Sequence, residues 1–530
     1  MTGAWGALAP GPVLAAAEAA AAPGGHALRA VVIGAAVAAS ALAGVRWLRV
    51  AQREHYLPDA ASRFAVRWWV RVPPNLAGLV VAVAGLVLAD RFPAAGFATA
   101  AVVALGPVGL SLRGRSAPLA WTRRLRTLGA LWALLVAAIV AGTTVGGIGP
   151  LAAAATALAT PALVDLAGAV LAPVERRLGR PYVRRAEERL RRVRPTVVAI
   201  TGSYGKTSTK GYVAHLVGGA RPVVASPASF NNRAGLARAV NEHLAEGTEV
   251  FVAEMGTYGP GEIAELCAWV RPDVGVITAI GPVHLERFGS EDAIVAAKAE
   301  ILAGVSAAVL VTDDARLARL ADECAPEVKV WRVSGRDPGA EVGVVEGPDG
   351  LTVHVGGEEI ARDVSLEARP GNVAAAVAVA LQLGVERAEV ARRLGTLPVA
   401  PHRLQPGVGP GGVVVLDDTY NANPAGGRAA LAALGRLGAD AGHRILVTPG
   451  MVELGRRQSE ENAALAEEAA AVATELVVVG RTNRRALVRG ADGTPVVVVR
   501  TREQATAWVR SHAGPGDVVL YENDLPDHYP

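Results

Sequence analysis

The sequence predicts a multi-domain fold: an N-terminal α-helical transmembrane bundle, then an α/β domain with a mostly parallel sheet, then a smaller Rossmann-like α/β domain. Three observations lead to this prediction. The chain has 530 residues, too many for one hydrophobic core. Hydrophobic residues make up 51% of it, and nearly charge-free runs of them are concentrated in its first third. After residue 195, short runs rich in Val and Ile alternate with helical patterns rich in Ala, Leu and Glu.

Residues 1–173 form the predicted transmembrane domain. The nearly charge-free runs are Ala30–Val45, Leu76–Ala89, Phe92–Leu112 and Thr127–Pro173. Because one span needs roughly 20 apolar residues, the last run is long enough for two helices, which gives about five spans. The fifth is the least regular, since it contains Pro161, Asp165 and several small residues. A cleaved signal peptide followed by soluble helices fits poorly, because no basic segment precedes the first apolar run.

Arginines beside the apolar runs set the predicted orientation. They follow the first and third spans, as Arg46, Arg49, Arg53, Arg63, Arg67 and Arg71, and then Arg113, Arg115, Arg123, Arg124 and Arg126. By the positive-inside rule the N-terminus lies outside and everything after the fifth span is cytoplasmic. We therefore expect a multi-pass protein of the cytoplasmic membrane whose soluble part faces the cytoplasm.

Residues 174–195 read as a basic juxtamembrane connector with nine arginines between Arg176 and Arg194. Such a run is either a solvated helix face or, beside a membrane exit, a segment that lies on anionic lipid headgroups. Its arginines account for much of the basic charge of the chain. Since no basic patch interleaved with aromatic residues occurs elsewhere, no nucleic-acid partner is expected.

The soluble part divides into a central domain, residues 196–397, and a C-terminal domain, residues 398–530. The expected strands of the central domain are Thr196–Thr201, Pro222–Ala225, Val250–Glu254, Val274–Ile280, Ala307–Val311 and Val328–Val333, followed by a hairpin over Glu341–Glu359 and a helix over Asn372–Leu383. A Pro/Gly-rich hinge, Pro398–Gly412, precedes the second domain. Its expected strands are Val413–Asp417, Arg444–Val447, Glu475–Val479, Val496–Val499 and Val518–Tyr521.

The stretch Ile200–Lys210 has the pattern of a phosphate-binding loop. A strand leads into Gly202-Ser203-Tyr204-Gly205-Lys206-Thr207-Ser208, and a helical pattern follows. Backbone N–H groups and the helix dipole face the anion, while Lys206 adds a point charge and the Thr207 hydroxyl is a ligand for Mg²⁺. The alternative is a tight glycine turn before an ordinary helix. The pattern indicates a P-loop ATPase domain that binds ATP and Mg²⁺.

Polar residues at strand ends supply further candidates for metal binding. Glu254 ends one predicted strand and His284 follows another, at the sheet edge where open parallel sheets bind their ligands. Together with Thr207 they are expected to converge on Mg²⁺. Taken singly, Glu254 is also typical of a helix-capping carboxylate, and His284 of a hydrogen-bonded loop histidine. Lys298 lies in a helical pattern, where a solvated lysine is the ordinary interpretation.

Several motifs occur in an order that resembles the Mur ligase family. They are Ile200–Lys210, Ser229–Gly235, Ala253–Gly256 with Gly261–Ile263, Gly281–Glu286, Lys298–Ile301, Leu416–Pro424 and Gly450–Gly455. The resemblance covers roughly residues 195–525. It is strongest to the branch of the family that adds D-alanyl-D-alanine to UDP-muramoyl-tripeptide. It implies an ATP-dependent peptide ligase of cell-wall (peptidoglycan-type) biosynthesis that acts through an acyl phosphate, which an amine attacks to give an amide.

The resemblance also implies roles for individual residues. Lys206 neutralises the β- and γ-phosphates, held by Gly202, Ser203, Gly205, Thr207 and Ser208. Two Mg²⁺ ions are expected, one on Thr207 and Glu254, the other on His284 and a carbamate formed on Lys298. Asn372 resembles the adenine-contacting asparagine, while Arg403 and Asp418 resemble residues that close over the nucleotide. The motif residues expected to bind substrate are Asn231, Asn232, Tyr420, Asn421 and Asn423.

The chain departs from the family pattern at the substrate side. The soluble domain that grips the UDP group in the family is replaced by the predicted membrane domain. Ala279 stands where Asn is common, and Tyr521–Asp524 stands where a Lys-Gly-Ser run is usual. We therefore expect a carboxylate substrate that is lipid-linked or held at the membrane, and an amine substrate that is a D-amino acid or a dipeptide such as D-alanyl-D-alanine.

Two other functions remain open from the sequence. A polymer ligase of the polyglutamate type uses a similar ATPase, although the Asp418–Pro424 stretch argues against it. A non-catalytic membrane scaffold that recruits cell-wall synthesis enzymes is disfavoured by the intact motif residues Lys206, Thr207, Glu254, His284 and Lys298.

Overall fold

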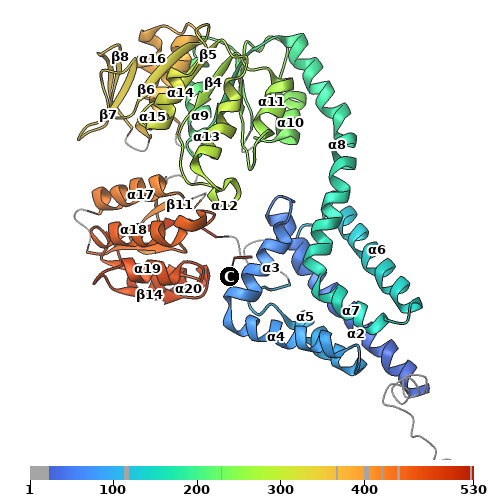
Figure 1. The fold of residues 1–530 in the computed structure, drawn as a ribbon. Helices are drawn as coiled ribbons and strands as arrows, with labels where there is room; N and C mark the ends of the chain where they lie inside the picture. The colour runs from blue at the N-terminus through green and yellow to red at the C-terminus, as the bar shows by residue number, and fades with distance from the viewer. Residues whose placement is uncertain are drawn as a thin grey trace, which may run out of the picture. The chain divides into compact units, whose positions relative to one another are not determined.

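The structure is a computed structural model that describes residues 23–112, 119–227, 230–365, 368–398, 405–419, 422–438, 442–525 and 528–529. The chain separates into two compact units (Figure 1). The helical unit comprises Met1–Leu178 together with Leu525–Pro530, and the α/β unit comprises Gly179–Asp524. The α/β unit is therefore inserted between two parts of the chain that belong to the helical unit.

The helical unit is built from apolar helices that pack on one another. They are α2 (Pro23–Arg53), α3 (Ala60–Arg71), α4 (Pro73–Leu88), the 3₁₀ turn η1 (Pro93–Ala95), α5 (Gly96–Leu105), α6 (Arg123–Val145), α7 (Gly149–Leu158) and α8 (Thr160–Val193). Helix α2 packs against α5 and α7, and α4 also packs against α5. The last helix, α8, continues into the α/β unit, so the predicted connector 174–195 is mostly the second half of one long helix.

The number of membrane spans stays a prediction. Among the described residues, α2 and α6 are long and apolar enough to cross a membrane. The pairs α3–α4 and α7–α8 reach that length only across bends of 104° and 75°, which gives four spans if each pair counts as one. Within the predicted span Phe92–Leu112 the structure has η1 and the ten-residue helix α5, which together form the shorter apolar stretch Pro93–Leu105. The outside position of the N-terminus also stays a prediction.

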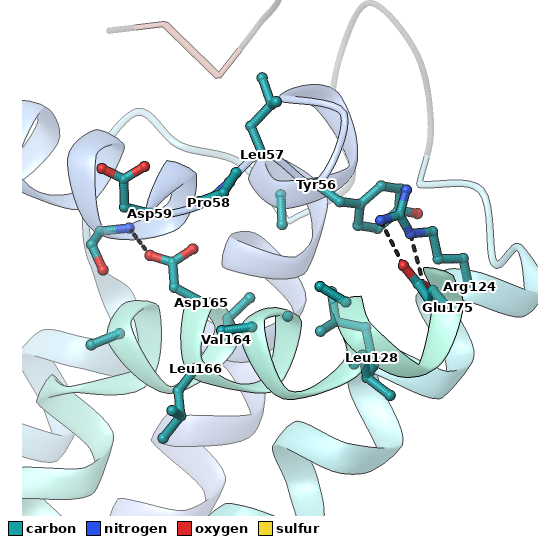
Figure 2. Close-up of a pocket in the computed structure, with 17 residues that line it drawn as sticks. Tyr56, Leu57, Pro58, Asp59, Arg124, Leu128, Val164, Asp165, Leu166 and Glu175 are labelled. Atoms are coloured by element: carbon teal, nitrogen blue, oxygen red, sulfur yellow. Dashed lines mark hydrogen bonds and ion pairs between the residues drawn. The ribbon is translucent and has the colours of Figure 1, made fainter. Parts of the chain in front are cut away.

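Ionic and polar groups join the ends of the helices within the helical unit (Figure 2). Asp165 of α8 accepts hydrogen bonds from the backbone N–H groups of Ala61 (3.1 Å) and Ser62 (2.8 Å), in the first turn of α3. It therefore caps α3 from another helix. Arg124, in the first turn of α6, forms an ion pair with Glu175 of α8 at 2.8 Å.

Residues 528 and 529 pack into the helical unit. The Trp68 indole N–H donates to the His528 carbonyl at 2.7 Å, and the His528 ring lies 2.8 Å from a Glu54 carboxylate oxygen. The Phe64 ring meets His528 and Tyr529 edge-on, with centroids 4.7 and 4.9 Å apart. His528 is completely buried. A segment from the far end of the chain is thus part of the core between α2 and α3.

The first sheet of the α/β unit has nine strands in the order β2-β3-β1-β4-β5-β6-β7-β8-β9, parallel as far as β7. Its strands are β1 (Thr196–Thr201), β2 (Val223–Ala225), β3 (Val250–Glu254), β4 (Val274–Ile277), β5 (Ala307–Val311), β6 (Lys329–Ser334), β7 (Val342–Glu346), β8 (Leu351–Val355) and β9 (Glu358–Val364). The predicted strands and the parallel order are confirmed. The predicted hairpin is the antiparallel meander β7-β8-β9.

Helices cover both faces of this sheet. Its helices are α9 (Lys206–Val217), α10 (Arg233–His243), α11 (Glu262–Val270), α12 (Leu285–Phe288), α13 (Glu291–Ala299), α14 (Ala315–Asp322), α15 (Pro370–Gln382) and α16 (Arg387–Leu394), with the 3₁₀ turn η2 (Glu300–Leu302). Val198 and Ile200 of β1 pack with α9 and α15, whereas Val197 and Ala199 pack with α10, α11 and the end of α8. Both faces of β1 are buried, as expected for a central parallel strand.

The second sheet has six strands in the order β10-β11-β15-β12-β13-β14. Its elements are β10 (Gln405–Val408), η3 (Pro410–Gly412), β11 (Val414–Asp418), α17 (Pro424–Leu437), β12 (Arg444–Thr448), η4 (Gly455–Arg457), α18 (Gln458–Ala470), β13 (Glu475–Val479), α19 (Arg484–Gly490), β14 (Val496–Val499), α20 (Arg502–His512) and β15 (Val518–Glu522). All predicted strands are confirmed. Strand β10 was not predicted: it lies inside the expected hinge and pairs antiparallel with β11.

Candidate active site

The predicted phosphate-binding loop joins the end of β1 to the start of α9. Gly205 has a φ of +85°, and a Cβ atom there would lie 2.3 Å from Asn372 Oδ1. Gly202 has a φ of +153°, and its Cβ would lie 2.0 Å from the Thr278 hydroxyl. Both positions therefore require glycine. The Lys206 ammonium donates to the Gly202 carbonyl at 2.7 Å, so its charge lies over the loop at the helix N-terminus.

The segment that follows β4 braces the phosphate-binding loop. The Ser203 N–H donates to the Ala279 carbonyl at 2.8 Å, and the Gly281 N–H donates to the Ser203 hydroxyl at 3.0 Å. The Tyr204 hydroxyl donates to the Ile280 carbonyl at 3.1 Å. The same segment leads to His284, so the loop and the histidine are fixed to one stretch of backbone.

Glu254, at the end of β3, contacts several polar side chains around the start of α9. Its carboxylate accepts from the Thr207 hydroxyl at 3.0 Å and from the Asn231 amide at 3.2 Å, and it forms an ion pair with Lys210 at 3.0 Å. Glu254 is 1% exposed. The structure thus brings together the predicted residues Thr207, Glu254 and Asn231. Sequence reasoning missed Lys210, although it lies one helical turn beyond Lys206 and Thr207.

Lys298, on α13, is buried with 5% exposure, which excludes the interpretation as a solvated lysine. Burial, and next the nearby charge of Lys206, lower the pKa of the Lys298 ammonium well below its ordinary value. Burial beside the phosphate-binding loop therefore disfavours the charged form of this amine.

His284 makes its closest polar contact with the C-terminal domain. Its Nδ1 atom pairs with the Glu453 carboxylate, and the Glu286 N–H donates to the Glu453 carbonyl at 3.3 Å. Among the described residues, no group of three or more His, Cys, Asp or Glu side chains has the arrangement of a metal site. The predicted convergence of His284 with Thr207 and Glu254 on Mg²⁺ stays a prediction. Glu453 lies in the Gly450–Gly455 motif, which had no assigned role.

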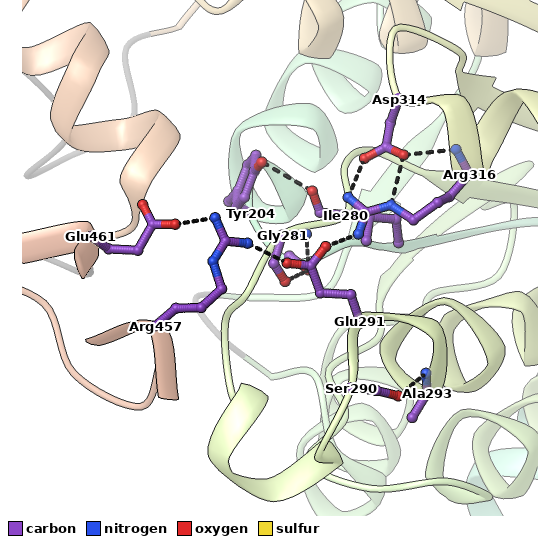
Figure 3. Close-up of polar contacts among 11 residues, drawn as sticks. Tyr204, Ile280, Gly281, Ser290, Glu291, Ala293, Asp314, Arg316, Arg457 and Glu461 are labelled. Atoms are coloured by element: carbon purple, nitrogen blue, oxygen red, sulfur yellow. Dashed lines mark hydrogen bonds and ion pairs between the residues drawn. The ribbon is translucent and has the colours of Figure 1, made fainter. Parts of the chain in front are cut away.

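A network of charged side chains connects the central domain to the C-terminal domain near Tyr204 (Figure 3). Arg316 donates to Asp314 at 2.9 and 2.7 Å and also pairs with Glu291. Arg457, from η4, donates to the same Glu291 at 2.6 Å and pairs with Glu461. Beside these groups is a cavity of about 440 Å³, whose lining also includes Tyr204, Gly281, Pro282, Pro424 and Arg428. Sequence reasoning missed this cavity, because its residues come from six separate segments of the chain.

Asp418 and Glu522 lie side by side where β11 and β15 end. Asp418 is 7% exposed and Glu522 is completely buried. One Glu522 oxygen accepts from the Thr448 hydroxyl at 2.8 Å. Burial, opposed by that hydrogen bond and reinforced by Asp418, raises the pKa of Glu522 to about 8. The buried pair lies at the edge of the second sheet where open parallel sheets bind ligands.

Of the remaining predicted residues, some cap or begin helices and others lie outside the described part of the chain. Asn232 caps α10 by accepting from the Gly235 N–H at 2.9 Å, and Asn423 caps α17 by accepting from the Gly426 N–H at 2.9 Å. Ser208 lies in the first turn of α9. Arg403, Tyr420 and Asn421 lie outside the described residues. Substrate binding by any of the asparagines stays a prediction.

Comparison with known proteins agrees with this arrangement. The family models of the Mur ligase middle domain and of the Mur ligase, glutamate ligase domain match residues 200–380 and 402–521. The UDP-N-acetylmuramoyl-tripeptide–D-alanyl-D-alanine ligase of Mycobacterium leprae is 35% identical over 363 residues, which cover 61% of this chain and 70% of that protein.

Solved structures of Mur ligases are also similar to this chain. A crystal structure of MurF from Acinetobacter baumannii aligns with a TM-score of 0.56 and 26% identity, over 64% of this chain and 76% of that one. The MurF ligase from Thermotoga maritima, solved in complex with ADP, aligns with a TM-score of 0.54 and 25% identity, over 65% of this chain and 80% of that one.

A phosphate-binding loop in a parallel-sheet domain, in contact with a second α/β domain, defines a nucleotide-using enzyme. The chain belongs to the Mur ligase family, and it is an ATP-dependent peptide ligase. The matched family regions begin at residue 200, so the helical unit lies outside them.

Proposed function

We propose that this ligase joins D-alanyl-D-alanine, or a related D-amino acid or dipeptide, to a carboxylate of a peptidoglycan-type precursor. The observation that carries the proposal is the 35% identity to a ligase named for that reaction, over 70% of its length. The intact phosphate-binding loop and the buried Glu254 and Lys298 support it, because burial of ionisable side chains beside such a loop is typical of a functional site.

The proposed reaction has two chemical steps. A carboxylate oxygen of the substrate attacks the γ-phosphorus of ATP, and ADP leaves. The amine nitrogen then attacks the acyl carbon, phosphate leaves, the nitrogen loses a proton, and an amide remains. Lys206 and the N–H groups that begin α9 are placed to neutralise phosphate charge during the first step.

The residues around Glu254 fit a bound Mg²⁺. Thr207 and Glu254 offer a hydroxyl and a carboxylate oxygen 3.0 Å apart, and oxygen ligands are those that Mg²⁺ prefers. When bound, the ion neutralises charge on the transferred phosphate. Lys210 forms an ion pair with Glu254 Oε2, the same oxygen that accepts from Thr207. Lys298 is suited to carry the carbamate, because burial lowers the pKa of its ammonium and only a neutral amine reacts with CO₂.

The carboxylate substrate is proposed to be lipid-linked or otherwise held at the cytoplasmic membrane, with the α/β unit in the cytoplasm, where ATP is available. This proposal rests on the apolar helices α2 and α6 in a unit that the matched family regions do not include. Purified protein, given ATP and D-alanyl-D-alanine, is expected to release phosphate faster with a lipid-linked muramoyl-peptide than with UDP-muramoyl-tripeptide. Equal rates would overturn the lipid-linked substrate while leaving the ligase itself in place.

Lys206→Ala tests catalysis directly. We expect a loss of phosphate release of at least about a hundredfold, since one preorganised charge on a transferred phosphate is worth that much. Lys329→Ala is the control, because Lys329 is an exposed lysine that packs over Trp331. Normal growth of cells that depend on the Lys206→Ala protein would favour the scaffold function instead.

A further inference from the structure

Lys210 lies on the same face of α9 as Thr207, because residues three positions apart are neighbours on a helix surface. Its ammonium pairs with Glu254 Oε2 at 3.0 Å, and the Thr207 hydroxyl donates to that same oxygen at 3.0 Å. The other oxygen, Oε1, accepts from the Asn231 amide at 3.2 Å. One oxygen of the candidate Mg²⁺ ligand is therefore shared by a hydroxyl group and a cation of the protein itself.

The ion pair of Lys210 and Glu254 is buried, with side chains that are 7% and 2% exposed. A carboxylate that is removed from water destabilises the fold unless a positive charge and hydrogen bonds compensate for the lost hydration. Thr207 and Asn231 donate hydrogen bonds, and Lys210 contributes the positive charge. Lys210 thus supplies from within the protein the charge that a metal ion at this site would supply.

The same contact places Lys210 in competition with a metal ion. An ion held by Thr207 and Glu254 has to share the carboxylate with the Lys210 ammonium. Two cations beside one carboxylate repel each other, and the repulsion is strong where water is excluded. The ion therefore gains less from Glu254 than it would gain from a carboxylate without a cationic neighbour.

We propose that Lys210 is a positioning residue, which acts as the internal counter-ion of Glu254 and sets the affinity of this site for Mg²⁺. It holds the carboxylate in place while no ion is bound, and it keeps the affinity for the free ion low. The ion is then retained mainly together with the phosphate oxygens of ATP, which add negative charge and further oxygen ligands. The Mg²⁺ site rests on the proposed function, whereas the buried ion pair does not depend on it.

The test measures binding of Mn²⁺, as the probe for the Mg²⁺ site, to the full-length protein without nucleotide by electron paramagnetic resonance. Lys210→Met removes the charge and keeps an unbranched side chain. We expect this variant to lower the Kd for Mn²⁺ by about tenfold or more, because a nearby like charge no longer opposes the ion. Lys329→Met, the same change at an exposed lysine, should leave the Kd unchanged.

Thermal unfolding provides a second measurement. In EDTA, Lys210→Met should unfold at a clearly lower temperature than the unsubstituted protein, because it leaves a buried carboxylate without its cation. Saturating Mn²⁺ should recover most of this difference, since the ion replaces the missing charge. If Lys210→Met does not fold without metal, Lys210→Gln replaces it, because glutamine keeps a hydrogen-bond donor but carries no charge.

Glu254→Gln separates failure of this inference from failure of the metal site. If Glu254→Gln abolishes Mn²⁺ binding but Lys210→Met leaves the Kd unchanged or raises it, the metal site stands and the counter-ion role is overturned. If Glu254→Gln does not weaken binding, the ion lies elsewhere and both are overturned. Neither measurement uses a peptide substrate, so an incorrect assignment of the ligase substrates would leave this inference intact.

Discussion

Glu254 is the residue through which the parts of the candidate active site are connected. It joins the end of β3 to two residues of α9, Thr207 and Lys210, and to Asn231 before α10. The position of Glu254 beside Thr207 was predictable from sequence, because both lie where neighbouring parallel strands end. The contacts of Lys210 with Glu254 and of Glu453 with His284 were not predictable, because the periodicity of a sequence does not specify which charged side chains lie inside the fold.

Gly205→Ala is expected to destabilise the phosphate-binding loop. The new methyl group meets Asn372 Oδ1 at 2.3 Å, and a φ of +85° is unfavourable for alanine. Thermal unfolding should show a loss of about 1 kcal/mol or more, with reduced ATP turnover. Gly211→Ala, within α9 and with nothing near its Cβ, should be neutral or slightly stabilising. Equal effects of the two variants would contradict the close contact with Asn372.

Glu522 should make stability fall as the pH rises. Its pKa is about 8 in the folded protein against 4.5 for the ordinary group, so between these values the folded state binds a proton that the unfolded state has lost. The unfolding free energy should therefore decrease by a few kcal/mol from about pH 5 to pH 9, at about 1.4 kcal/mol per unit of pKa difference. Glu522→Gln should flatten this profile in chemical denaturation, while the exposed Glu467→Gln should retain it. A profile unchanged by Glu522→Gln would show that another group titrates.

At the scale of elements, η4 and α12 join the two domains of the α/β unit. Glu453 contacts His284 and Glu286 before and within α12, and Arg457 of η4 contacts Glu291 of α13. These contacts lie beside the cavity next to Tyr204. If the C-terminal domain closes over a nucleotide, as the family resemblance implies, these are the side chains that we expect to make or release the contact.

Arg457→Met should weaken this contact and leave the fold intact. The ion pair with Glu291 is partly exposed, so the loss of stability should stay below about 1 kcal/mol. The KM values of the substrates should rise several-fold, because the domains are positioned less well. Arg456→Met is the matched control, since Arg456 is the exposed neighbour in the same turn. A fall in kcat without any change in KM would assign Arg457 another role.

Most elements of the α/β unit were predictable, and the exceptions have physical causes. Strands such as β1 and β13 are continuous Val/Ile runs buried on both faces, which is a strong local signal. Strand β10 has the sequence Gln-Pro-Gly-Val, and its place in a sheet depends on pairing with β11 alone. In the helical unit, composition predicted apolar helices but not the bends at Val72 and near Ala159, which decide how many helices are long enough to be candidate spans.

At the scale of the whole molecule, the packing of residues 528 and 529 in the helical unit is the least expected feature. Trp68→Phe removes the hydrogen bond to the His528 carbonyl, which is worth about 1 kcal/mol. Hydrogen exchange in the peptide that contains His528 should become faster. The control is Trp121→Phe, because Trp121 is 49% exposed. Unchanged exchange in Trp68→Phe would mean that the aromatic contacts with Phe64 are sufficient.

The division of the chain has a consequence for engineering. Because Gly179–Asp524 lies between two stretches that both belong to the helical unit, the α/β unit is attached to the helical unit at both of its ends, the first attachment being the continuous helix α8. A chimera that receives another ligase between Leu178 and Leu525 keeps both attachment points. After a single protease cut within the α/β unit, both fragments should remain attached to the helical unit and co-purify with it.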